Sequence, residues 1–162
     1  MKGLATVLAI ALVGPALTTA CSDHEFHPPS EEERQALADS VYSPTLFDSL
    51  AWSGDSTRIA AGNLVYADEC RRCHGVLGQG ETEYAATHEL DVPSLVAPEW
   101  DYDDDLEAVR RRIFIGHASG MPNWGVGHLS PRQIDAAAFY ILEQLRPEVL
   151  QGAAPTDSPP VD

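Results

Sequence analysis

The sequence predicts an all-α fold, for two reasons. Apolar residues recur at helical spacing in three stretches, residues 56–70, 106–114 and 131–145. Motifs that cap helix N-termini also precede helical patterns, each with an oxygen-bearing residue and a Glu or Gln three positions later: Ser30 with Glu33, Asp104 with Glu107, and Ser130 with Gln133. The motif at Ser30 predicts a further short helix that ends near Asp39.

Residues 1–20 have the layout of a secretory signal peptide. A lysine precedes an apolar run over residues 4–17, and small residues follow before Cys21. The run is short for a membrane span, and a Gly-Pro pair interrupts it. We therefore expect the chain to be exported from the cytosol.

The end of this signal resembles the lipobox of bacterial lipoproteins. In Leu17-Thr18-Thr19-Ala20-Cys21 the cysteine would be lipid-modified and would become the mature N-terminus. Several acyl chains, at ~0.8 kcal/mol per buried methylene, would anchor the protein firmly on the periplasmic side of a bacterial membrane. The alternatives are cleavage to a soluble protein with a free Cys21, and retention of an uncleaved helix.

Residues 21–55 are predicted to form an N-terminal tether or extension. Its apolar side chains could pack on the domain or touch a partner, and packing is the commoner outcome; they are Leu46, Phe47, Leu50 and Trp52. We expect the domain to span residues 56–147, followed by a disordered, acidic and proline-rich tail over residues 148–162.

Two details of the predicted helices concern their packing and their ends. Gly62 lies inside the first domain helix, where glycine costs ~1 kcal/mol relative to alanine. A second helix that crosses closely at Gly62 would explain this glycine. The last helix has proline at its first position and is expected to end before Pro147.

The stretch Cys70-Arg71-Arg72-Cys73-His74 is typical of a c-type haem attachment site. Two thiols one helical turn apart can add to the two vinyl groups of one porphyrin, and the adjacent histidine can bind the iron. Zinc would need further ligands, and no cysteine lies downstream. A thioredoxin-like dithiol lies at a helix N-terminus, whereas this pair follows a helical pattern. A structural disulfide leaves the histidine unexplained. We predict one haem c, bound through both cysteines, with His74 as an iron ligand.

Met121 is the predicted sixth ligand of the iron. It is the only methionine after the first residue, and it lies in a loop between Gly120 and Pro122. A methionine that fills a core gap would normally lie in a periodic apolar segment. His117 and His128 are the alternative ligands.

Net charge excludes some classes of partner. The chain carries −15 at pH 7, and residues 1–20 hold one lysine and no acid, so the remainder has nine arginines against 25 acids, or −16. Nucleic acids and anionic membrane surfaces are therefore poor partners, and a redox partner protein with a basic docking patch is favoured. Solubility alone is the alternative explanation. The arginines at 110–112 could pair with haem propionates or with the acidic run at 101–105.

Residues 56–147 resemble the class I (monohaem) cytochrome c family. The matching features, in order, are Gly62 and Tyr66, the Cys-x-x-Cys-His motif, Val92-Pro93-Ser94-Leu95, Gly120-Met121-Pro122-Asn123-Trp124, and a last helix with Tyr140. The resemblance implies three or more helices wrapped around one haem, with the first and last helices crossing near Gly62 and Tyr140. It also implies that the Pro93 carbonyl accepts a hydrogen bond from the other ring nitrogen of His74.

We expect an electron carrier and not an enzyme. His/Met ligation fills both axial positions of the iron and favours the reduced state. One alternative is a cytochrome subunit of a larger respiratory or dehydrogenase complex. Another is a haem enzyme or gas sensor, which needs an open iron position.

Overall fold

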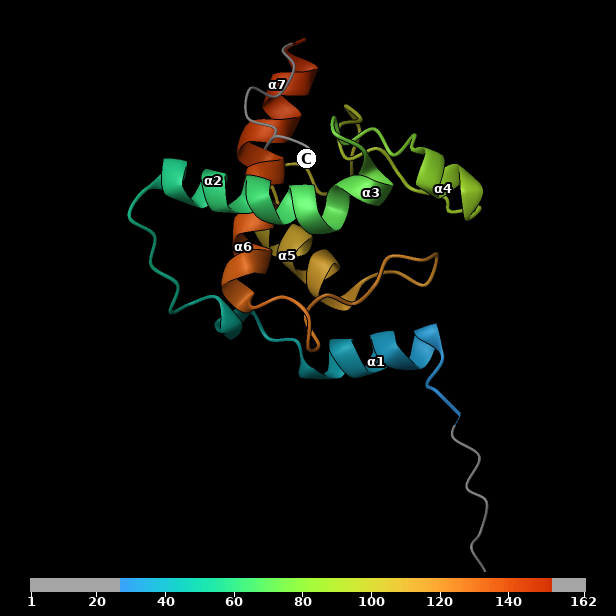
Figure 1. The fold of residues 1–162 in the computed structure, drawn as a ribbon. Coiled ribbons are helices and arrows are strands. Elements are labelled where there is room, and N and C mark those ends of the chain that lie inside the picture. Colours follow the sequence, from blue (N-terminus) through green and yellow to red (C-terminus); the bar gives the residue numbers. More distant parts are fainter. Residues whose placement is uncertain (1–26, 153–162) are drawn as a thin grey trace, which may run out of the picture.

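The computed structural model describes residues 27–152, and within this range the regular structure is helical, without β-strands (Figure 1). The all-α prediction is confirmed. The predicted signal peptide and the lipidation site at Cys21 lie outside the described residues, as does the tail from residue 153.

Two long helices form the frame of the domain. Each one contains a π-helical turn in its middle, so that three labelled elements follow one another without a break. The first is α2 (Asp55–Val65), η2 (Tyr66–Cys70) and α3 (Arg71–His74), and the second is α6 (Pro131–Tyr140), η3 (Ile141–Leu145) and α7 (Arg146–Leu150).

These two helices cross at Gly62, as Figure 1 shows for α2 and α6. A Cβ atom on Gly62 would lie 2.0 Å from the carbonyl oxygen of Ala136 and 2.6 Å from Cβ of Tyr140. Only glycine therefore allows the backbones to approach this closely. The expected crossing near Gly62 and Tyr140 is confirmed.

The second helix continues past Pro147 to Leu150, so the prediction that it ends before the proline is wrong. The wide turn η3 precedes the proline, and the Arg146 N–H donates to the Ile141 carbonyl, five residues back. Pro147 is the second residue of α7, just after this wide turn.

Helix α5 (Leu106–Ile115) packs on α6, and a short helix, α4 (Glu83–Thr87), lies in the long loop after α3. The cap of α5 is Asp105, not the predicted Asp104, because the Asp105 carboxylate accepts a hydrogen bond of 2.9 Å from the Ala108 N–H. Asp104 itself adopts φ +58°, which lies outside the helical region.

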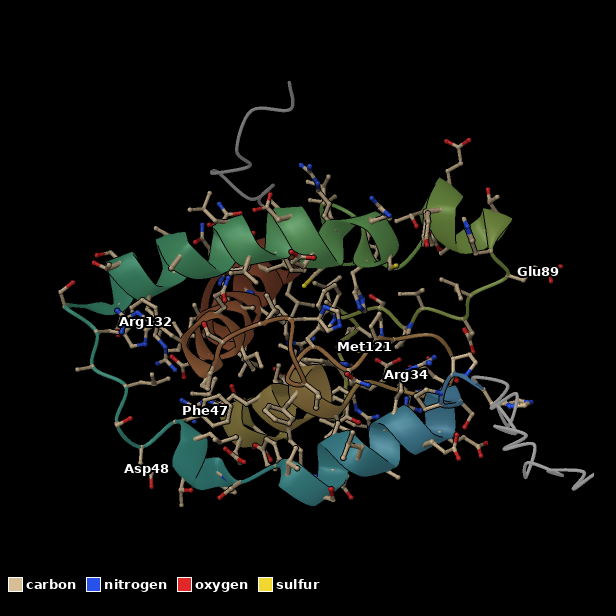
Figure 2. All side chains as sticks on the ribbon, turned by 60° about the horizontal axis from the view of Figure 1, so that its bottom comes forward. Arg34, Phe47, Asp48, Glu89, Met121 and Arg132 are labelled. Atoms are coloured by element: carbon tan, nitrogen blue, oxygen red, sulfur yellow. The ribbon has the colours of Figure 1, made fainter. Side chains whose placement is uncertain are left out.

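The extension packs against the domain. Its helix α1 (Glu31–Val41) has the predicted capping box at Ser30 and lies on α5, and the turn η1 (Pro44–Leu46) follows. Phe47 is buried at 5% exposure, and Figure 2 shows it at the inner side of this segment. The apolar residues of the extension therefore contribute to the core that α2, α5 and α6 form.

A buried carboxylate ties the extension to both frame helices. Asp135 on α6 is 1% exposed and accepts hydrogen bonds from Trp52 Nε1 (2.7 Å), Arg58 Nε (2.8 Å) and Arg110 Nε (2.9 Å). Burial alone would raise the pKa of Asp135, but the bonds from Arg58, Arg110 and Trp52 outweigh it and hold that pKa below its ordinary value.

We predict that Asp135→Asn lowers the free energy of unfolding of the haem-loaded protein by about 3 kcal/mol at pH 7, because two largely buried arginines lose their anion. The native pKa of Asp135 is depressed, so its contribution is complete above the unfolded pKa of about 4 and is lost as the pH falls below it. The difference between wild type and variant should therefore shrink in acid.

Denaturant titrations at pH 7 and pH 3 test this prediction. Glu31→Gln is the matched control, because it breaks the more exposed Glu31–Arg34 pair and should change stability by less than about 0.5 kcal/mol. Equal losses in the two variants, or an Asp135→Asn effect that grows in acid, would contradict the assigned role of the buried carboxylate.

Candidate haem site

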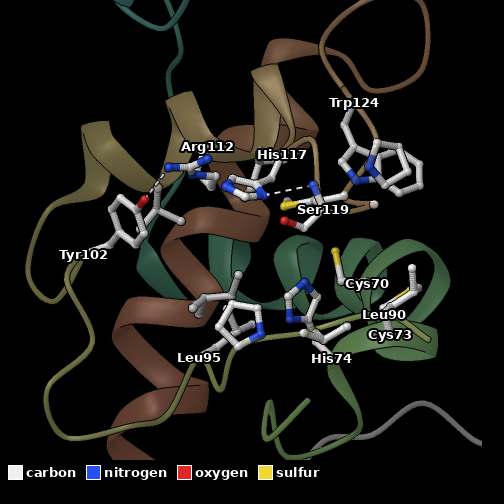
Figure 3. A pocket seen from close by; sticks show the side chains of 18 of the residues that line it. Cys70, Cys73, His74, Leu90, Leu95, Tyr102, Arg112, His117, Ser119 and Trp124 are labelled. Carbon is white, nitrogen blue, oxygen red and sulfur yellow. Dashed lines mark hydrogen bonds between the residues drawn. The ribbon is translucent and has the colours of Figure 1, made fainter. Parts of the chain in front are cut away.

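An apolar cavity of about 360 Å³ opens beside α3, between the two frame helices, α5 and the loops that follow α3 and α5 (Figure 3). Its walls include Leu95, Val109, Ile113 and Ile141. The residues predicted from the sequence to hold the haem all line this one cavity: Cys70, Cys73, His74, Pro93 and Met121.

The two thiols line the cavity and form no disulfide with each other. Cys70 ends the π-helical turn and is buried, and Cys73 lies one turn further on, in α3. Burial raises the pKa of Cys70 to about 12, and burial also raises the pKa of Cys73, against the opposing charge of Arg72. A redox dithiol needs a lowered thiol pKa, so the arrangement does not suit thioredoxin-like chemistry.

His74 presents a neutral imidazole to the cavity. Burial lowers the pKa of His74 to about 4, and the Pro93 backbone acts in the opposite direction. The buried Nδ1 atom has no hydrogen-bond partner of good geometry in the structure, so the Pro93 bond stays a prediction. A neutral ring beside an apolar cavity is the form in which histidine binds a metal, and it fits an iron ligand.

The loop that carries Met121 faces His74 across the cavity; Figure 3 shows its His117 and Ser119 opposite His74. Two backbone hydrogen bonds join His117 and Met121, at 2.8 and 3.0 Å, and fix the loop's base. Figure 2 shows Met121 between the α2–α3 helix and α5.

The two alternative histidine ligands both make other contacts. His117 lines the cavity, but its Nδ1 accepts a hydrogen bond of 3.1 Å from the Ser119 N–H, so in the neutral ring Nε2 holds the proton. Iron binding by Nε2 would require the ring proton to move to Nδ1 and the bond from Ser119 to break. His128 does not line the cavity and packs edge-on against Trp124, with 6.0 Å between ring centroids.

The structure separates three consecutive arginines that the sequence could not assign. Arg110 forms a salt bridge with Asp135. Arg111 forms one with Asp39, with 2.5 Å between nitrogen and oxygen. Arg112 lines the cavity. Arg112 donates to the hydroxyl of Tyr102 at 2.5 Å, and Figure 3 shows this pair at the cavity wall.

Sequence reasoning missed Trp100 and Tyr102 as lining residues. The available signal was two aromatic residues in an otherwise acidic run. Together with Arg112 they place hydrogen-bond donors on the cavity wall, the kind of group that binds carboxylates.

Crossed helices around an apolar cavity, with paired thiols and a neutral imidazole in its wall, define a c-type cytochrome domain. The chain belongs to the family of cytochrome c oxidase, cbb3-type, subunit III, whose family model matches residues 57–141. The cofactor of this family is covalently bound haem c, and the residues that line the cavity fit that group.

Curated relatives carry the names of cbb3-type oxidase subunits. CcoP of Rhodobacter capsulatus is 32% identical over an alignment of 119 residues that covers 65% of this chain and 38% of the relative. FixP of Bradyrhizobium diazoefficiens is 35% identical over 82 residues, which cover 51% of this chain and 26% of the relative. CcoP of Azospirillum brasilense is 33% identical over 89 residues, which cover 55% of this chain and 29% of the relative. The chain thus spans well under half the length of these relatives.

Among residues 27–152, none of the helices combines the length and the apolar character needed to cross a bilayer.

We predict that replacing both Cys70 and Cys73 by serine abolishes covalent haem attachment. The haem of the wild type should stay on the chain in denaturant, because thioether bonds survive unfolding, whereas coordination bonds to side chains do not. Mass measurement of the denatured chain, with and without the mass of haem, checks this. Cys21→Ser is the control and should keep its haem; haem retained in the double variant would refute the assignment.

Proposed function

We propose that this protein is a monohaem c-type cytochrome that carries electrons, with His74 and Met121 as the axial ligands. The single observation that carries the proposal is the placement of both residues on the wall of one apolar cavity, with the two cysteines beside His74. When bound, the haem iron gains and loses one electron. The chain's part is to fix both ligands, exclude water from the iron and hold the porphyrin edge.

The surroundings of the cavity suit electron transfer better than substrate chemistry. With both axial positions filled, gain of an electron requires little rearrangement. A haem enzyme or gas sensor would need an open position, and the 117–121 loop is tied at its base by two backbone hydrogen bonds. Arg112 and Tyr102 would hold the propionates, which keeps their charge paired at the cavity edge.

A second candidate function is that of a cytochrome subunit in a respiratory complex. The names of the relatives, all cbb3-type oxidase subunits, favour it. In either case we propose export to the periplasmic side and a lipid anchor at Cys21, supported by the signal pattern of residues 1–21. Co-purification with an oxidase from solubilised membranes, compared with recovery as a single chain, distinguishes the subunit from the free carrier.

We predict that Met121→Ala opens the iron to carbon monoxide. Wild-type ferrous protein should not bind it, and its ferric form should show the methionine–iron charge-transfer band. The variant should bind carbon monoxide, lose the band and have a lower reduction potential, because water or no ligand replaces the thioether. Absorption spectra and a redox titration provide the measurement.

His117→Gln is the matched control, since glutamine keeps an acceptor for the Ser119 N–H. It should retain the band and remain closed to carbon monoxide. If the wild type binds carbon monoxide readily, or if His117→Gln behaves as we expect for Met121→Ala, the His/Met proposal fails.

The partner is proposed to present a basic patch. Three exposed acids lie among the residues that line the cavity, Glu69, Asp91 and Asp101. We predict that electron transfer to a basic partner slows steeply as ionic strength rises, since salt screens exposed charges over ~10 Å at 0.1 M. Stopped-flow rates over a salt series test this, with an acidic partner as control; rates that salt leaves unchanged would refute it.

A further inference from the structure

We propose that the N-terminal extension positions the Met121 loop, and that Tyr42 is the residue through which it does so. The inference rests on the proposed ligation of iron by Met121 and adds a role for a segment outside the haem-binding core. Tyr42 does not line the cavity, so it is a positioning residue that acts through α5.

The loop that carries Met121 is attached to the end of α5 on both sides. After Met121 the chain returns to the helix, where the Trp124 N–H donates to the Ile113 carbonyl at 3.3 Å and the Gly125 N–H donates to the Phe114 carbonyl at 3.0 Å. Before Met121 the loop starts at the end of α5, with Gly116 as the C-cap. Both limbs of the loop are therefore held by residues 113–117, and a shift of this turn would carry the methionine with it.

Phe114 connects this turn to the extension. Its ring is 5% exposed, and it lies so close to the loop that a Cβ on Gly125 would be 2.2 Å from ring atoms. The same ring packs edge-on against Tyr42, with 5.2 Å between centroids and 71° between planes. One aromatic side chain thus touches the loop backbone and the extension.

Tyr42 is itself held firmly in place. Its hydroxyl donates to the carboxylate of Glu107 on α5, and its ring also lies 6.3 Å from that of Phe47. Burial and the adjacent Glu107 carboxylate raise the pKa of Tyr42 well above its ordinary value, so the phenol remains a donor. A salt bridge of 2.5 Å between Asp39 and Arg111 aligns α1 along the same helix.

Loss of the Tyr42 ring would leave Phe114 room to move, and the loop would follow. The ligand bond would then open more often, because the methionine would no longer be held against the cavity in one arrangement. Imidazole added to the ferric protein competes for the same iron position, so its affinity reports how readily the methionine leaves.

The experiment compares Tyr42→Ala with the wild type in the full-length, haem-loaded protein. We expect imidazole to bind on the order of fivefold more tightly to the variant, with a weaker methionine–iron charge-transfer band. Tyr42→Phe keeps the ring contact with Phe114 and loses only the hydroxyl bond to Glu107, so its affinity should lie closer to that of the wild type than to that of Tyr42→Ala. Tyr42→Leu keeps part of the volume and should give an intermediate affinity; it also provides the measurement if Tyr42→Ala does not fold.

Trp52→Phe is the control for a general loss of stability. It weakens the attachment of the same extension, but at Asp135, on the opposite frame helix from Cys70. We expect unchanged imidazole affinity in this variant even where its unfolding free energy falls. Equal tightening in Trp52→Phe and Tyr42→Ala would overturn the positioning role, because stability alone would then explain it.

The outcomes separate this inference from the proposed function. Suppose that the wild type shows the methionine–iron charge-transfer band and that Tyr42→Ala changes neither this band nor the affinity for imidazole. This result would refute the positioning role and leave the His/Met proposal intact. A wild type without the band, open to imidazole, would refute the ligation and with it the inference.

Discussion

The contact between α2 and α6 at Gly62 is the constraint on which the rest of the structure depends. Because the backbones meet with no side chain between them, the two frame helices lie close together at this point. Tyr66 and Tyr140 pack against each other, with 5.6 Å between their ring centroids. The Tyr66 hydroxyl donates a hydrogen bond to the Gly75 carbonyl, just past the cysteine motif. The position of the haem-binding turn thus follows from the crossing.

The cluster around Asp135 extends this frame to the N-terminal extension. One carboxylate accepts from the extension, from α2 and from α5, so three separate segments share one buried anion. A burial of this kind is tolerated only because the anion's hydrogen bonds are satisfied. The buried carboxylate thus joins the N-terminal extension, which the sequence alone places outside the domain, to the helices that surround the cavity.

The sequence predicts the local chemistry better than the long-range contacts. The spacing of Cys70, Cys73 and His74, and the lone methionine in its loop, are local patterns that the chemistry of haem attachment requires. The glycine at the helix crossing could also be predicted, since an unfavourable residue inside a helix calls for a packing reason.

The partners of the charged residues could not be predicted in this way. Successive residues of a helix point about 100° apart, so Arg110, Arg111 and Arg112 must have different partners, but only tertiary packing decides which one faces the cavity. That the last helix continues past Pro147 could not be predicted either, because a π-helical turn has no clear sequence signal.

The π-helical turn before Cys70 also bears on how the chain can change in length. Such a turn is equivalent to one extra residue in an α-helix, and it lies between the crossing at Gly62 and the rest of the cysteine motif. Deleting one residue there would close the turn to ordinary α-helix and leave the rotation of the motif about the helix axis nearly unchanged. One more residue, with no second wide turn to accommodate it, would instead rotate the motif by about 100°, and both thiols and the imidazole would leave the cavity together. The wide turn therefore keeps the motif in phase with the crossing despite the extra residue.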